Sequence, residues 1–218
     1  MKSAGKAIAV AWLLTAVYYF YQYVLRSAPA VMMPELSQAF GLSAIGVASL
    51  AGLFYYGYSP FSLVAGVALD RWGARTVVPV GAAAVGLGAF MFATGDGDTA
   101  SVGRFVQGAG GVFALLGAVY LATRYFPASR AATLIGATQM FGMAGGFAGQ
   151  FMVGPAIAGG LPWSRFWIYM GVAGSASACC CCSSCRGPRP GRSAAAGSAR
   201  RAMPWQPCFA THSRSCAG

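Results

Sequence analysis

Charged residues are scarce in this chain, and acidic residues are the scarcest. Four acidic and 15 basic residues make up 9% of the 218 positions, against about 25% in ordinary soluble domains. The single histidine, His212, and all seven cysteines follow residue 178, so earlier residues offer no imidazole or thiolate ligand for a metal and no nucleophilic thiol. No Gly-x-x-x-x-Gly-Lys run indicates a nucleotide-driven pump. We therefore expect no metal, no cofactor and no enzymatic activity.

Long apolar runs make up most of the chain. The chain is 57% hydrophobic with a mean hydropathy of +0.59, and its apolar residues collect into blocks of about 20, enough to cross a bilayer. A lipid-facing backbone must satisfy its own hydrogen bonds, so each block is expected to be helical. The sequence predicts an all-α polytopic membrane protein with six transmembrane helices, at about residues 7–25, 43–69, 77–94, 102–123, 131–157 and 163–182.

The loops between these blocks alternate in charge. Lys2 and Lys6 precede the first block, and every second loop after it is basic, carrying Asp70, Arg71 and Arg75, then Arg124 and Arg130. The intervening loops carry Glu35, then Asp96 and Asp98, then Arg165. The positive-inside rule therefore predicts that both termini are cytoplasmic, in an inner cell membrane. Because the first block has bulky tyrosines where a signal peptide is cleaved, we expect it to be retained.

The net charge of +11 does not indicate a nucleic acid partner. Up to residue 182, nine basic and four acidic residues leave +5. Membrane topology accounts for that excess.

Between the second and third blocks stands Gly66-Val-Ala-Leu-Asp70-Arg71-Trp-Gly73-Ala-Arg75. It resembles the cytoplasmic signature loop of the Major Facilitator Superfamily, Gly-x-x-x-Asp-Arg-x-Gly-x-Arg/Lys. The resemblance implies that Asp70, Arg71 and Arg75 form a charge relay that latches the two transporter halves in the outward-facing state. It also implies that Gly66 permits close packing and Gly73 a tight turn.

Two further motifs resemble the same family. Arg104-Phe-Val-Gln107-Gly108 matches Arg-x-x-Gln-Gly in the fourth helix, and residues 154–160 resemble the Gly-Pro-x-x-Gly-Gly end of the fifth through Gly154, Pro155, Gly159 and Gly160, with one extra residue. Residues 19–33 resemble bacterial members close to lysosomal dipeptide carriers. The resemblance covers about residues 7–175.

The resemblance implies the N-terminal half of a twelve-helix secondary transporter, a symporter or antiporter for a small polar solute. Its expected partners are the lipid bilayer, a carboxylate, amino acid or short peptide as substrate, H+ or Na+ as coupling ion, and a C-terminal half. The alternative is a six-helix membrane protein with a structural or regulatory role and no transport.

One helical face of the first block is polar, with Thr15, Tyr19, Gln22, Tyr23 and Arg26. Under a functional interpretation, Arg26 captures a carboxylate while the tyrosines and Gln22 contact the rest of the substrate. Alternatively, Arg26 extends to the outer interface and the tyrosines form an aromatic belt.

Other polar faces are candidates as well. Arg104 and Gln107 are predicted either to contact substrate or couple protons, or only to hold helices together, and Gln139 is a possible cavity residue. In the second block, Tyr55, Tyr58, Ser59 and Ser62 form a similar face. Glycines four apart in the fifth block, Gly142 with Gly146 and Gly145 with Gly149, predict close helix packing or flexibility at a moving interface.

Residues 183–218 form a basic tail rich in Cys, Arg and Pro, distinct from the membrane domain of residues 1–182. Four adjacent cysteines suit neither a zinc site nor a disulfide framework. A shifted reading frame that turns Leu codons into Cys codons explains the tail, and would make the product a truncated transporter. The alternative is a genuine disordered tail attracted to anionic lipid.

Overall fold

The structure is a computed structural model that describes residues 2–184 of the chain, with side chains for residues 6–181. Within this part the regular structure is entirely helical, which confirms the predicted all-α class. The helices are α1 (Lys2–Val31), α2 (Met33–Phe40), α3 (Ala44–Trp72), α4 (Ala74–Ala93), α5 (Gly97–Tyr125), α6 (Ala128–Phe151), α7 (Val153–Ala158) and α8 (Trp163–Ser184).

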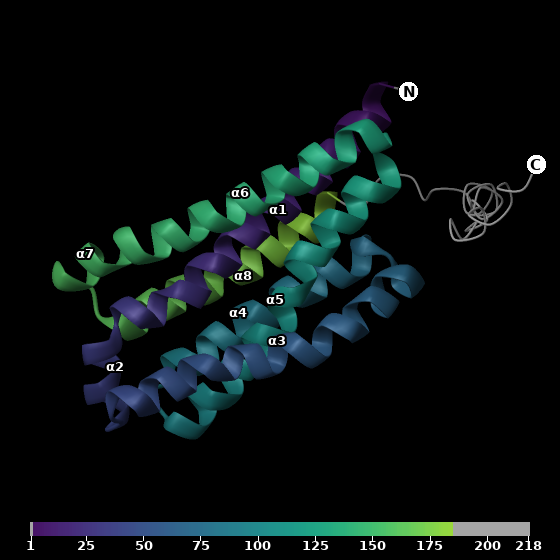
Figure 1. Cartoon of the computed structure of the whole chain (residues 1–218). Coiled ribbons are helices and arrows are strands. Elements are labelled where there is room, and N and C mark those ends of the chain that lie inside the picture. The colour runs from purple at the N-terminus through teal and green to yellow at the C-terminus, as the bar shows by residue number, and fades with distance from the viewer. Residues whose placement is uncertain (1, 185–218) are drawn as a thin grey trace, which may run out of the picture. The chain divides into compact units, whose positions relative to one another are not determined.

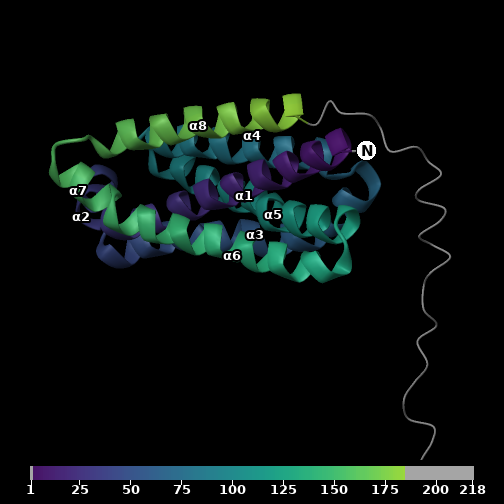
Figure 2. The ribbon, with the colours of Figure 1, turned by 90° about the horizontal axis from the view of Figure 1, so that it is seen from above.

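The six long helices of this part lie side by side and alternate in direction, while the short α2 and α7 lie at the same end of the bundle (Figure 1). The view from above shows the same bundle with α8 beside α4 (Figure 2). α5 lies between α3 and α4, and α6 packs on α1. Consequently the turns carrying Arg71 and Arg130 share one end of the bundle, and those carrying Asp98 and Arg165 share the other.

The six predicted blocks coincide with these six long helices, but not all are equally apolar. In the described part, α1, α4 and α5 are long and hydrophobic enough to cross a membrane, and α2 and α3, bent by 101° relative to each other, qualify together as a fourth span. α6 and α8 have 24 and 22 residues, about 36 and 33 Å at 1.5 Å per residue. Their many Gly, Ala and Ser residues lower their hydropathy.

Two details differ from the sequence expectation. The fifth block is broken: α6 ends at Phe151, and residues 153–158 form the separate helix α7. The loop after α1 contains α2, which has Pro34 in its first turn and is followed by Gly41 in the left-handed conformation. Proline is favoured at the start of a helix and glycine just after its end, so these two residues were a sequence signal for a short helix.

Local side chains define where several helices begin. The Asp96 carboxylate caps α5, accepting hydrogen bonds from the Thr99 backbone N–H at 3.0 Å and the Thr99 hydroxyl at 2.7 Å. The Thr99 hydroxyl and then its N–H favour the ionised carboxylate, which lowers the pKa of Asp96. The Ser43 hydroxyl caps α3 in the same way by accepting from the Gly46 N–H.

Glycines allow the helix backbones to approach closely. A Cβ added at Gly145 would collide with the Phe20 carbonyl of α1, and one at Gly108 would collide with the Phe54 carbonyl of α3. The α1–α6 and α3–α5 contacts therefore require glycine at these positions. In lipid, such close approach is a main source of helix association.

Candidate solute-binding site

Arg26 lies on an open face between α1 and α3. Its Nε donates a hydrogen bond to the Tyr55 hydroxyl at 3.0 Å. The guanidinium carbon lies 4.9 Å from the ring centroids of both Tyr23 and Tyr55. Two tyrosine rings thus hold the guanidinium by cation–π contacts, and no other described residue accepts a hydrogen bond from its two terminal nitrogens.

The polar network continues along α1 to α6. The Tyr19 hydroxyl donates to Gln139 Oε1 at 2.9 Å and lies 3.3 Å from the Tyr23 hydroxyl. The rings of Tyr19 and Tyr23 pack edge to face at 4.9 Å. The side chains of Tyr19, Tyr23, Arg26, Tyr55 and Gln139 therefore form a continuous polar belt across α6, α1 and α3, which we call the polar belt.

Gln22 does not belong to the polar belt, although the sequence analysis placed it on the same helical face. Its side chain is 1% exposed and packs against Gly111 of α5. Neither its Oε1 nor its Nε2 has a hydrogen-bond partner. The α1 face of the predicted site is in fact divided, because α5 covers the side that carries Gln22 and Thr15.

Arg104, in the first third of α5, is buried inside the bundle, with 1% of its surface exposed. Its Nη1 donates to Gln107 Oε1 at 2.8 Å and to the Leu25 carbonyl at 3.3 Å, and its Nη2 donates to the Ala51 carbonyl at 3.3 Å. In the described part it has no acidic partner. These hydrogen bonds tie α5 to α1 and α3.

Three aromatic rings complete the surroundings of Arg104. The rings of Phe54, Phe92 and Trp167 lie 5.5, 5.7 and 5.8 Å from its guanidinium carbon. Carbonyl oxygens and ring faces thus offset the cost of burying this cation. Sequence reasoning missed the three aromatics, since nothing in their spacing relates α3, α4 and α8 to Arg104.

The signature loop lies at the end of the bundle where α3 meets α4. Asp70, Arg71 and Arg75 are all exposed there. Gly73 has a φ of 73°, a conformation that glycine adopts readily, and its N–H donates to the Leu69 carbonyl. At Gly66 an added Cβ would meet no described atom within 4 Å, so close packing there requires a surface outside the described residues.

The remaining predicted packing residues lie on α6 and α7. Gly142 faces the Tyr19 ring closely, but Gly146 faces the Tyr23 ring at an ordinary 3.5 Å, and nothing lies within 4 Å of a Cβ at Gly154. Pro155 is exposed on α7, Gly159 ends that helix, and Gly160 has a φ of 95°. The Gly-Pro-x-x-x-Gly-Gly stretch therefore terminates α7 here.

The described residues contain no group of three metal-ligating side chains. Helices of membrane-spanning length carry the polar belt, whose members range from the buried Tyr19 to the exposed Tyr55. Such helices define a polytopic membrane protein. Residues 13–214 match the family model of the Major Facilitator Superfamily. The chain belongs to this superfamily of membrane transporters, as its signature loop indicated.

Comparison with curated proteins gives no match. The resemblance to the branch close to lysosomal dipeptide carriers therefore stays a prediction. Membership establishes transport of a solute across a membrane as the activity of the family, and leaves the roles of individual residues to experiment.

Proposed function

We propose that this chain forms one wall of the solute pathway in a secondary active transporter, with the polar belt as the surface that contacts the solute. The supporting observation is the hydrogen-bonded tyrosine–arginine network, which lies on helices whose other exposed side chains are largely apolar, such as Met140 and Phe147. A small polar solute, namely a carboxylate, amino acid or short peptide, would bind there and be released by alternating access.

The proposal includes a second wall. In this view a C-terminal half covers the polar belt, packs near Gly66 and pairs with the charges at Asp70, Arg71 and Arg75. Flux is coupled to H+ or Na+, both termini face the cytoplasm, and the membrane is the inner cell membrane. On this proposal residues 1–182 act as the membrane domain, and residues 183–218 follow a shift of reading frame.

Arg104 enters this proposal as an internal support. Its guanidinium is enclosed by carbonyl oxygens and rings, so a solute in the polar belt would not reach it without a rearrangement of α1. This argues for the packing interpretation of Arg104 and Gln107 over direct substrate contact.

Uptake by reconstituted vesicles tests the function. We would compare the 218-residue chain, the same chain with Arg26→Gln, and a version translated in the restored downstream frame. A membrane potential of about 100 mV supplies about 2.3 kcal/mol per charge, enough for roughly 50-fold accumulation. Accumulation of a solute that collapses with the gradient and weakens in Arg26→Gln supports the proposal.

The rival function is a structural or regulatory membrane protein. It would be favoured if neither the 218-residue chain nor the restored-frame version moves any solute of a broad polar library while these two proteins fold and insert normally.

A further inference from the structure

The charge of the polar belt is uncompensated. Arg26 is its one ionised side chain, and the acidic residues of the chain all lie elsewhere: Glu35 in α2, Asp70 at the end of α3, and Asp96 and Asp98 at the start of α5. No described carboxylate is ion-paired or hydrogen-bonded with Arg26. An open guanidinium without an acidic partner is a site for an anion that the protein does not itself supply.

The directions of the available hydrogen bonds fit a carboxylate. The Nε of Arg26 is occupied by the Tyr55 hydroxyl, which leaves the two terminal nitrogens, and the Tyr55 proton itself, free to donate. Two nitrogens on one edge of a planar fork match the two oxygens of a carboxylate. A doubly charged phosphate would leave one charge unmatched here.

The belt offers no negative charge for a cation next to that carboxylate. An ammonium group can also bind neutral oxygens or the face of an aromatic ring, but the faces of Tyr23 and Tyr55 nearest the site already hold the Arg26 guanidinium. The neutral acceptors that remain are the tyrosine hydroxyl oxygens and the second lone pair of Gln139 Oε1, which accepts from Tyr19. An ammonium on the α-carbon of the bound ligand would therefore sit beside the Arg26 guanidinium, with no carboxylate among the described residues to offset the repulsion.

We propose that the polar belt binds a carboxylate whose α-carbon carries no ammonium group, such as a monocarboxylic acid or the C-terminal end of an acylated or peptide-linked residue, and discriminates against free α-amino acids. This inference rests on the proposed function only in taking the polar belt as the solute-contacting surface. Of the three proposed kinds of solute, namely a carboxylate, an amino acid and a short peptide, it excludes the free amino acid.

A matched ligand series separates charge from shape. N-acetylphenylalanine, phenylalanine, phenylalaninamide and N-acetylphenylalaninamide share one ring, which the tyrosines of the belt can contact, and differ in the charges around the α-carbon. We would measure their binding to the full 218-residue chain in lipid nanodiscs, by competition with tritiated N-acetylphenylalanine. N-acetylphenylalanine is expected to bind at least tenfold more tightly than each of the other three.

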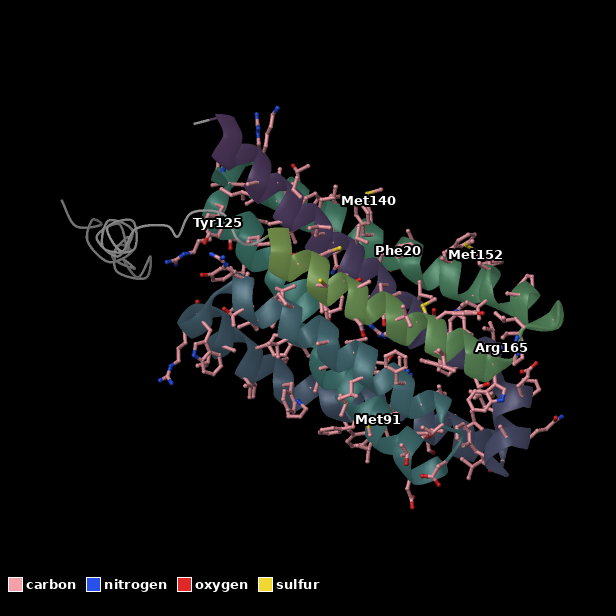
Figure 3. The ribbon with its side chains drawn as sticks, turned by 180° about the vertical axis from the view of Figure 1, so that it is seen from behind. Phe20, Met91, Tyr125, Met140, Met152 and Arg165 are labelled. Atoms are coloured by element: carbon pink, nitrogen blue, oxygen red, sulfur yellow. The ribbon has the colours of Figure 1, made fainter. Side chains whose placement is uncertain are left out.

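Two substitutions, each with a matched control, test whether Arg26 and Tyr55 bind the carboxylate. Arg26→Gln should weaken N-acetylphenylalanine binding at least tenfold and abolish the discrimination against phenylalanine. Arg165→Gln is the matched control, because Arg165 is an exposed arginine at the start of α8 (Figure 3), and it should change binding less than twofold. Likewise Tyr55→Phe should weaken binding severalfold, whereas Tyr56→Phe, at the exposed neighbouring position, should not.

Three outcomes would overturn the inference: equal binding of phenylalanine and N-acetylphenylalanine, unchanged binding in Arg26→Gln, or no saturable binding of N-acetylphenylalanine at millimolar concentration. Failure of the proposed function looks different. Suppose that vesicles containing the chain bind N-acetylphenylalanine selectively, but that neither they nor vesicles with the restored-frame version transport it. The proposed selectivity of the polar belt is then supported, and its proposed role in transport is contradicted. If the vesicles transport all four ligands equally well, the proposed transport is supported and the proposed selectivity is contradicted.

Discussion

At Leu25 the carbonyl oxygen of α1 lacks its usual helical donor, because the residue four positions later is Pro29. Arg104 donates to this carbonyl from α5. A proline in one helix and an arginine in another thus meet at one backbone oxygen. An unsatisfied carbonyl in lipid is costly, so the two residues should be energetically coupled.

Replacing Arg104 with Met should destabilise the folded chain by about 2 to 4 kcal/mol, since buried carbonyls of Leu25 and Ala51 lose their donor. In a Pro29→Ala background the new N–H can bond Leu25, so the same replacement should cost about 1 kcal/mol less. Thermal unfolding in detergent measures both. Simple additivity of the two changes would contradict the coupling, and Arg165→Met serves as a surface control.

Gln22 is the opposite case, because its buried side-chain amide has no hydrogen-bond partner. Replacing it with Leu removes two unsatisfied polar atoms, so the free energy of unfolding should stay level or rise by about 1 to 2 kcal/mol. Gln150→Leu, on the exposed side of α6, is the matched control. A clear fall in the melting temperature of Gln22→Leu would show that the amide has a partner, such as water, in the membrane.

Among the helices, α6 shows how a row of glycines divides between two faces. Gly142, Gly145 and Gly149 lie against α1, where an added Cβ would collide with ring, carbonyl or hydroxyl atoms. Gly146, between them, has room for a methyl group. Spacing by four residues predicted packing, but it paired positions that do not share a face equally.

The substitution Gly145→Ala should therefore separate α6 from α1 and destabilise the chain by about 1 to 3 kcal/mol. Gly146→Ala should be neutral or slightly stabilising, because alanine is the better helix former. Thermal unfolding in detergent, together with the yield of folded protein, distinguishes the two. Equal effects at both positions would mean that the α1–α6 contact differs from the one described.

At the scale of the whole molecule, the basic turns gather at one end of the bundle and Asp96 and Asp98 lie at the other. Figure 3 marks the two ends by Tyr125, at the end with the basic turns, and by Arg165, which lies at the opposite end. The alternating direction of the helices produces this distribution. It supports a multi-pass orientation with the basic end in the cytoplasm.

In a background with all cysteines replaced, Asp98→Cys should react with a membrane-impermeant maleimide on intact cells, and Arg130→Cys only after the cells are opened. Both positions are exposed, so accessibility in the folded protein does not limit the reaction. Labelling of residue 130 in intact cells would contradict the predicted orientation and place the basic end outside the cytoplasm.

The features that could be predicted from the sequence are those set by residues close together in the chain. The approximate positions of the six long helices, the signature loop and the family follow from apolar runs and local motifs, because a chain that crosses lipid needs long apolar helices. The short helix α2 and the break between α6 and α7 were not predicted. Other features depended on which helices became neighbours. They are the contact of Arg26 with Tyr55, the contact of Tyr19 with Gln139, the burial of Gln22, and the hydrogen bond from Arg104 to the Leu25 carbonyl that Pro29 leaves without a donor. The sequence pattern did not predict these features because they depend on residues far apart in the chain, so only the tertiary structure decided them.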